Sequence, residues 1–185
     1  MEEVFREAQN LLDKGEPFVI ATVVGTKGST PQKPGAKLLV RKDGSGVGTL
    51  GGGCVEGDIW FAAKQLMKRG GASQYREYHL NENLAAQDGL VCGGTMYFLI
   101  DPVYQPGQYL SFAEEIDHAY AGEGAVALAN LIQAPAHSTA SLGAKLLIRE
   151  DSSTEGTLGS LDLDSEAIQK ALDLMVHGNN EYVIS

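Results

Sequence analysis

The sequence has few cysteines and few basic residues, and it lacks a long apolar run. Its 185 residues include two cysteines, and 14 lysines and arginines stand against 24 aspartates and glutamates, which gives a formal net charge of −10 at pH 7. Nucleic-acid binding requires clusters of lysine and arginine that neutralise phosphates, so this charge balance excludes that class of partner. A membrane-spanning helix needs about 18 consecutive apolar residues, and no segment of the sequence has them.

The small number of cysteines also limits the redox and metal chemistry of the chain. Neither cysteine has a second cysteine or a histidine at the spacing of a zinc site. The four histidines share no spacing, so none is a good candidate for a metal ligand. The N-terminal residues are acidic and do not resemble a signal peptide. We therefore expect a cytoplasmic protein whose thiols stay reduced, rather than one with a structural disulfide.

Glycine is abundant, with 23 residues, and each cysteine lies beside a run of glycines. Gly51, Gly52 and Gly53 precede Cys54, between a strand-like run over 47–50 and an amphipathic helical pattern. We predict that Cys54 lies at or just before a helix N-terminus, where unpaired N–H groups favour anions and thiolates. The alternative is a tight turn around a small buried cysteine. One glycine suffices for a turn, so we favour a site in which Cys54 is the more reactive thiol at neutral pH.

The second cysteine lies in a similar setting. Cys92 precedes Gly93 and Gly94, just ahead of an apolar run that predicts a strand. Because both cysteines lie beside glycines, we expect Cys54 and Cys92 to face one cleft, lined also by the loop over 28–31.

The chain contains an internal repeat, which decides its predicted organisation. Residues 18–71 align with residues 126–179 at a constant offset of 108 and without a gap, and 12 of the 17 positions over 35–51 are identical. We predict a mixed α/β (α+β) fold, a single domain of two pseudo-repeated helix–strand–hairpin–helix–strand halves. Residues 1–103 form the predicted functional half, and residues 104–185 form a degenerate structural repeat.

The two copies differ at the cysteine. Residues 52–54, Gly-Gly-Cys, align with residues 160–162, Ser-Leu-Asp. Asp162 and Asp164 are typical first-turn acids of a helix, and a carboxylate there would repel a phosphate. The second copy is therefore predicted to have a structural role and no binding site of its own.

Hydrophobic periodicity predicts the elements of each half. Helices are expected over 4–12, 56–69, 110–120 and 163–177, and strands over 18–24, 36–41, 75–80, 95–100, 125–132 and 144–149, with about ten strands in all. Trp60 and Phe61 are expected to pack in the core or at the interface of a homodimer.

Three motifs occur in order along the first half: Gly28-Ser-Thr-Pro-Gln-Lys-Pro-Gly-Ala-Lys37, Gly48-Thr-Leu-Gly-Gly-Gly-Cys-Val-Glu56 and Gly89-Leu-Val-Cys-Gly-Gly94. In their residues and spacing they resemble the N-terminal domain of the XdhC/CoxI family over about residues 17–102, and the second half fits more weakly. Members of this family are maturation factors for xanthine dehydrogenase, CO dehydrogenase and related molybdenum hydroxylases.

The resemblance implies an accessory protein that is not itself an enzyme. Such a protein binds molybdenum cofactor (molybdopterin), protects it and inserts it into the apoenzyme of a molybdenum hydroxylase, often together with a cysteine desulfurase. Cys54 is also the candidate ligand of the molybdenum. The cofactor-binding residues implied by the motifs are Gly28, Ser29, Thr30, Gly52, Gly53, Cys54, Glu56, Cys92, Gly93 and Gly94.

The sequence departs from the family pattern in two ways. Members usually continue into a C-terminal Rossmann-type domain, which does not follow Ser185, so we expect a short stand-alone member or a trimmed piece. A position often held by arginine is Gln32, which removes one expected anion contact.

Several alternatives stay open. Cys54 could be the nucleophile of a sulfur-transfer enzyme that acts on the cofactor, or the chain could be a partner-recognition module with inert cysteines. Glu56 could be an ordinary first-turn helix acid. Lys37 could be a solvated strand residue, since Lys145 repeats it. The glycines of the first half do not form a dinucleotide fingerprint, so no NAD site is expected.

Overall fold

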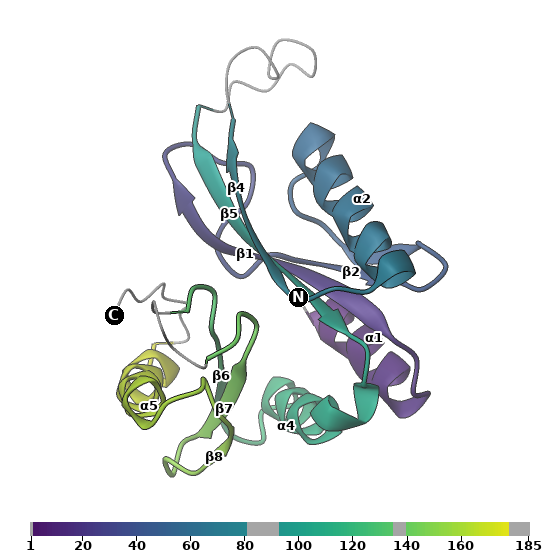
Figure 1. Ribbon diagram of the computed structural model, residues 1–185. Coiled ribbons are helices and arrows are strands. Elements are labelled where there is room, and N and C mark those ends of the chain that lie inside the picture. Colours follow the sequence, from purple (N-terminus) through teal and green to yellow (C-terminus); the bar gives the residue numbers. More distant parts are fainter. Residues whose placement is uncertain (1, 81–92, 135–139, 178–185) are drawn as a thin grey trace. The chain divides into compact units, whose positions relative to one another are not determined.

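Figure 1 shows the computed structural model, which describes residues 2–80, 93–134 and 140–177. The predicted mixed α+β class is confirmed, since helices accompany two antiparallel sheets. The chain divides into two compact units, Met1–Leu110 and Ser111–Ser185. Within the described ranges, no helix has the length and apolar character needed to cross a bilayer.

The first unit holds a five-stranded sheet. Its strands follow the order β3-β2-β1-β5-β4, and all neighbours are antiparallel. The elements are α1 (Glu2–Asp13), β1 (Phe18–Lys27), β2 (Lys37–Arg41), β3 (Gly46–Gly48), α2 (Gly53–Arg69), β4 (Gln74–His79), β5 (Thr95–Val103) and the 3-10 helix η1 (Pro106–Tyr109).

The second unit holds a three-stranded antiparallel sheet in the order β6-β7-β8. Its elements are α4 (Leu110–Tyr120), β6 (Val126–Asn130), β7 (Lys145–Arg149), β8 (Thr154–Gly156) and α5 (Leu161–Met175). The described residues thus contain eight strands rather than the expected ten. The last strand expected for the second copy, from Tyr182, lies outside them.

The core of the first unit lies between the sheet and α2. Alternate residues of β1 are fully buried, which is the period-2 pattern of a strand with one face against a core. Ile59, Ala63 and Leu66 of α2 are buried at helical spacing and belong to the same cluster. Trp60 packs against this cluster, as expected. Phe61 is 62% exposed, which rules out core packing for it and leaves the interface of a homodimer as the prediction.

Equivalent contacts recur in the two units at the offset of 108. Phe18 of β1 pairs with Arg41 of β2, and Val126 of β6 pairs with Arg149 of β7. Arg41 Nε donates to Glu7 Oε1 over 2.6 Å, and Arg149 Nε donates to the carboxylate of Glu115 over the same distance. Each unit therefore has the same arrangement of strands and an equivalent ion pair between its first helix and its central hairpin.

β1 is longer than predicted, and its extra residues position the candidate site. The pairing of β1 with β5 shifts register between Val23 and Gly25, which is a β-bulge. Beyond it, β1 continues to pair with β5 until Lys27 lies opposite Thr95. The residues that follow β1 therefore lie next to those that precede β5.

Candidate functional site

Cys54 is exposed and lies at the N-terminus of α2, as predicted. The alternative of a small buried cysteine in a turn is wrong. Gly52 is the N-cap of α2, with φ +74°, and no side chain caps this end of the helix. The first-turn amides and the thiol of Cys54 are thus presented at a helix N-terminus, which attracts negative charge.

Glu56 holds the turn that leads into α2. Its Oε2 accepts hydrogen bonds from Thr49 Oγ1 over 2.6 Å, from the N–H of Leu50 over 2.5 Å and from the N–H of Gly52 over 3.1 Å. Burial raises the pKa of the Glu56 carboxyl, but these hydrogen bonds outweigh it and hold the pKa below its ordinary value. The carboxylate therefore stabilises the turn over 49–52, which we call the glycine turn.

In the second unit, a carboxylate accepts equivalent hydrogen bonds from the turn, an arrangement that we call the carboxylate lock, but the helix begins differently. Asp164 accepts from Thr157 Oγ1 over 2.7 Å and from the N–H of Leu158 over 2.7 Å. Here, however, Ser160 is the N-cap of α5, and its Oγ accepts from the N–H of Leu163 over 3.3 Å. The lock thus belongs to the shared framework, whereas the uncapped helix start with a thiol belongs to the first unit.

The loop that follows β1 lies against the residues that precede β5. A Cβ built at Gly94 would lie 2.4 Å from the backbone oxygen of Ser29, so only glycine permits this approach. A Cβ built at Gly28 would lie 3.2 Å from the Cα of Gly94. Thr30 Oγ1 donates to the carbonyl of Gln32 over 2.9 Å, which fixes the loop internally.

The same loop also contacts the glycine turn. A Cβ built at Gly51 would lie 2.8 Å from the Cβ of Pro31. The loop over 28–32 therefore lies beside both the glycine turn and Gly94, so three segments that the sequence singles out as separate motifs are neighbours in the first unit. We call them together the glycine site.

One predicted member of this site is not among the described residues. Cys92 lies outside the described residues, so its convergence with Cys54 on one cleft stays a prediction. Within the described ranges, no group of three or more histidine, cysteine, aspartate or glutamate side chains is arranged to hold a metal ion.

Lys37 belongs to the framework rather than to an open surface. Its Nζ donates to Thr22 Oγ1 over 3.1 Å and lies 5.7 Å from the centre of the Phe5 ring. This agrees with its recurrence as Lys145 and makes it a weak candidate for anion binding.

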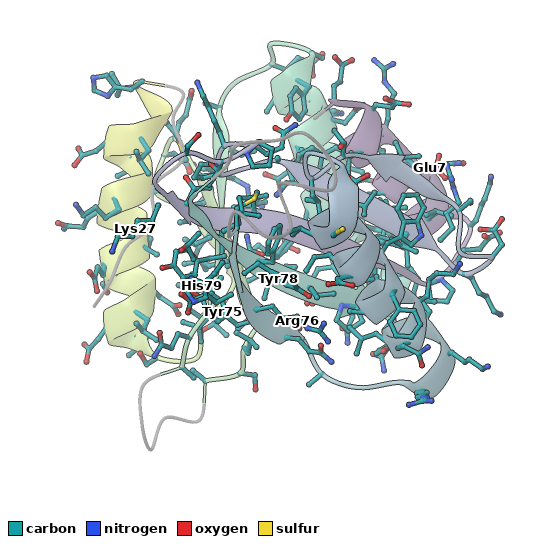
Figure 2. All side chains as sticks on the ribbon, turned by 90° about the horizontal axis from the view of Figure 1, so that it is seen from above. Glu7, Lys27, Tyr75, Arg76, Tyr78 and His79 are labelled. Atoms are coloured by element: carbon teal, nitrogen blue, oxygen red, sulfur yellow. The ribbon has the colours of Figure 1, made fainter. Side chains whose placement is uncertain are left out.

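Sequence reasoning missed two residues that the sheet register brings to this end of the first unit. Lys27 of β1 and His79 of β4 are labelled in Figure 2. Both residues pair with Thr95 of β5. His79 Nδ1 also lies 3.1 Å from Thr95 Oγ1. Both side chains are exposed and lie one residue in register from Gly94. No local sequence signal could find them, because their proximity depends on strand pairing.

Comparison with known proteins agrees with the resemblance seen in the motifs. The family model described as the XdhC and CoxI family matches residues 11–79 and 119–184. Over 99 residues the chain is 38% identical to Uncharacterized protein YqeB of Escherichia coli K12, which covers 52% of this chain and 18% of that protein.

Two further relatives carry informative names. The chain is 35% identical over 92 residues to the Molybdenum cofactor insertion chaperone PaoD of Escherichia coli K12, covering 49% of this chain and 28% of the chaperone. It is 46% identical over 50 residues to a Bacillus subtilis 168 protein named as a probable xanthine dehydrogenase subunit, covering 27% of this chain and 15% of that protein.

A solved structure has a similar fold. The crystal structure described as a xanthine dehydrogenase from Bacillus halodurans matches with a TM-score of 0.63 and 25% sequence identity, covering 85% of this chain and 46% of that one. Each of these matches spans less than half of the relative's own length.

Proposed function

Because the chain belongs to the XdhC and CoxI family, we propose that it is an accessory factor that binds molybdenum cofactor, protects it and inserts it into a molybdenum hydroxylase. The name of the chaperone PaoD supports the cofactor, and the xanthine dehydrogenase names of other relatives support the class of recipient. A cysteine desulfurase is the proposed second partner, as the source of sulfur for the cofactor.

The observation that carries this proposal is the meeting of the three glycine-bearing segments in the first unit. The second unit repeats the strands, the ion pair and the carboxylate lock, but it has Ser160 and Asp162 where the first has Gly52 and Cys54. Framework alone does not require this difference. A ligand that approaches the backbone closely and contacts a thiol would explain the glycine and the cysteine of the first unit.

The residues present fit the cofactor. When bound, molybdenum cofactor supplies a metal–dithiolene centre and a terminal phosphate. A Cβ built at Gly52 would meet no atom within 4 Å, so a ligand can approach the backbone there. The amides of the first turn of α2 beyond Gly52, whose N–H is bonded to Glu56, and the exposed Ser29 hydroxyl suit the phosphate. The sulfur of Cys54 is the soft donor that suits a molybdenum centre.

The remaining residues of the site have supporting functions in this proposal. Glu56 holds the amides of the glycine turn in place through its hydrogen bonds. Gly94 permits the close approach of the loop that carries Ser29. Lys27 adds a positive charge at the same end of the sheet, in a chain whose net charge is −10.

Cofactor retention tests the proposal. The protein is purified from cells that make molybdenum cofactor and from cells that cannot, and each sample is assayed for molybdenum content and pterin fluorescence. We expect both signals only in the first sample. Equal signals from the two samples would contradict the proposal.

A matched pair of variants locates the binding. Cys54→Ser should lose most of the bound molybdenum, whereas Asp162→Ser, at the equivalent position of α5, should keep it. Both variants should retain the melting temperature, since each changes an exposed first-turn residue. Full molybdenum content in Cys54→Ser would remove the thiol from the site.

The exposure of Cys54 also favours sulfur transfer as a second candidate function. In that reaction the Cys54 thiolate attacks the sulfane sulfur of a persulfide donor, the donor leaves as a thiolate, and Cys54 becomes a persulfide with no net oxidation. Mass spectrometry of peptides after incubation with a persulfide donor would detect one added sulfur atom on the wild-type peptide that holds Cys54 and none on the same peptide of Cys54→Ser.

A further inference from the structure

A pocket of about 290 Å³ lies between the C-terminal half of α2 and strand β4, within the first unit. α2 has 17 residues, and at 1.5 Å per residue it is about 25 Å long. Cys54 is at its first turn, and Arg69, which lines the pocket, is at its last residue. The pocket is thus distinct from the glycine site.

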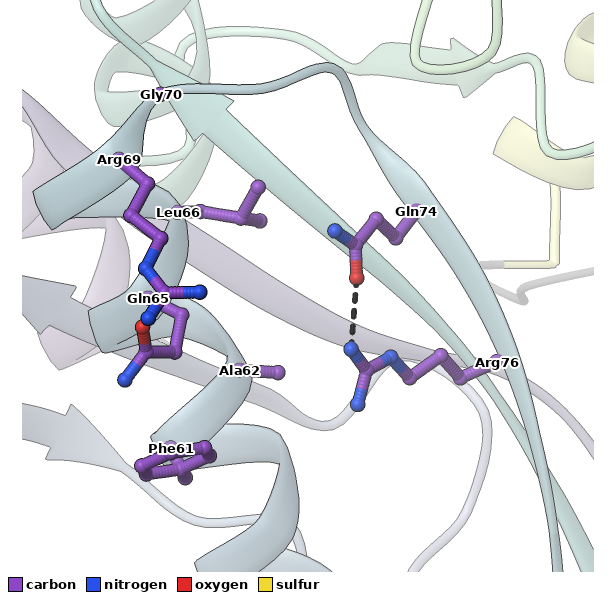
Figure 3. A pocket seen from close by; sticks show the side chains of 8 residues that line it. All are labelled: Phe61, Ala62, Gln65, Leu66, Arg69, Gly70, Gln74 and Arg76. Atoms are coloured by element: carbon purple, nitrogen blue, oxygen red, sulfur yellow. Dashed lines mark hydrogen bonds between the residues drawn. The ribbon is translucent and has the colours of Figure 1, made fainter.

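The charged side chains that line this pocket are both basic. Arg69 and Arg76 line it from α2 and from β4, and no acidic residue lines it (Figure 3). Arg76 extends from β4 toward α2, and its Nη2 donates to Gln74 Oε1 over 2.8 Å. Neither guanidinium makes an ion pair with any residue that the structure describes. Among the described residues, these two arginines thus have no acidic partner, although the chain has ten more acidic than basic residues.

The rest of the pocket is lined by apolar side chains and by the neutral amides of Gln65 and Gln74. Phe61 and Leu66 of α2 line it, and Phe61 is 62% exposed. Gln65 Oε1 is buried and accepts no hydrogen bond from the described residues. Leaving a buried carbonyl oxygen without a donor carries a desolvation cost. A ligand with an N–H or O–H group next to its anion would offset this cost.

We propose that this pocket binds a small organic anion in which a phosphate or carboxylate is attached to an aromatic or heterocyclic ring. The guanidiniums of Arg69 and Arg76 hold the anionic group, since their planar forks match both phosphate and carboxylate oxygens. The exposed face of Phe61 stacks on the ring. The volume suits a ligand of one ring and one anionic group, at the small end of the usual range for ligand pockets.

Four probes separate the contributions of ring and charge. Phenyl phosphate and benzoate have both a ring and an anion, inorganic phosphate has only the anion, and phenol has only the ring. Binding to the whole chain is measured by calorimetry and by amide chemical shifts, in a buffer without phosphate or sulfate. We expect phenyl phosphate and benzoate to bind with saturation and to shift the amides of β4 and of the last turns of α2. The two single-feature probes should bind at least about tenfold more weakly.

Variants assign the contacts. Arg69→Gln and Arg76→Gln should each weaken phenyl phosphate binding about tenfold, and Arg76→Lys should fall between Arg76→Gln and the wild type. Phe61→Ala should weaken phenyl phosphate but leave inorganic phosphate unchanged. Lys68→Gln is the matched control, because Lys68 has the same charge and lies in the same turn but does not line the pocket.

Each outcome supports or overturns the proposal. Equal loss in Lys68→Gln and Arg69→Gln would mean that general charge, not the pocket, attracts the probes. Failure of both ring-bearing probes to bind the wild type, or shifts confined to other surfaces, would overturn it. The melting temperature of each variant is measured alongside, and Arg76→Lys keeps the test decisive if Arg76→Gln is unstable.

Discussion

Replacing Glu56 by glutamine removes the negative charge that locks the glycine turn. The carboxylate oxygen accepts three hydrogen bonds, two of them from backbone amides. Hydrogen bonds to a charged group are worth about 1.5–3 kcal/mol each. Glutamine keeps one carbonyl oxygen that can accept weaker bonds, and the side chain is only half-buried, so water screens part of the loss. We expect Glu56→Gln to lower the free energy of unfolding by about 1–2 kcal/mol, or the melting temperature by roughly 3–6 °C.

The pH dependence of this loss is the sharper part of the test. Because the pKa of Glu56 is lowered in the folded state, the carboxylate stabilises the fold above the ordinary glutamate pKa of about 4.3. That stabilisation is lost as the pH falls through the folded-state pKa. The difference in melting temperature between wild type and Glu56→Gln should therefore be full at pH 7 and shrink below about pH 4.

Thermal unfolding followed by circular dichroism between pH 3 and pH 8 measures both effects. Asp164→Asn changes the equivalent carboxylate of the second unit and should also lower stability at pH 7. Of the two variants, only Glu56→Gln should also reduce the molybdenum content. A difference of less than about 1 °C at pH 7, or one that is constant with pH, would refute the reasoning.

Three further predictions test the framework and the site. Gly159→Ala places a Cβ 2.6 Å from Ala140 at a residue with φ +105°, so stability should fall by about 1–3 kcal/mol; loss of bound molybdenum without loss of stability would contradict its framework role. Gly94→Ala places a Cβ 2.4 Å from the backbone oxygen of Ser29, so both stability and molybdenum content should fall, and an unchanged protein would show that the close approach is not required. Iodoacetamide should alkylate Cys54 faster than the other cysteine at neutral pH, as measured on single-cysteine variants; equal rates would argue against an activated thiol.

The elements of the central hairpins could be read closely from the sequence. The strands expected over 36–41 and 144–149 are β2 and β7, each one residue shorter at its start. Both have an apolar triplet between a lysine and an arginine, and this local pattern is sufficient to place a short buried strand. The start of α2 was less accurate, because glycines add no hydrophobic period and the helix begins at Gly53 rather than at 56.

Features that depend on pairing between distant segments could not be read in this way. β5 runs to Val103 although Pro102 lies within it, and a proline argues against a strand. It is tolerated because β4 reaches only to the pair Gln74–Ile100, so that at Pro102 the strand has β1 on one side alone. The positions of Lys27 and His79 also depend on strand register, so the sequence alone did not predict that they lie close together.

The different starts of α2 and α5 have a consequence for local opening. Ser160 caps α5, whereas α2 begins with Gly52 and Gly53 at positive φ. Each glycine gains about 0.5–1 kcal/mol more backbone entropy on unfolding than another residue would. The first turn of α2 should therefore open more readily than that of α5, and its amides should exchange faster with deuterium. A ligand at this turn would slow the exchange, so that binding and local ordering become a single event.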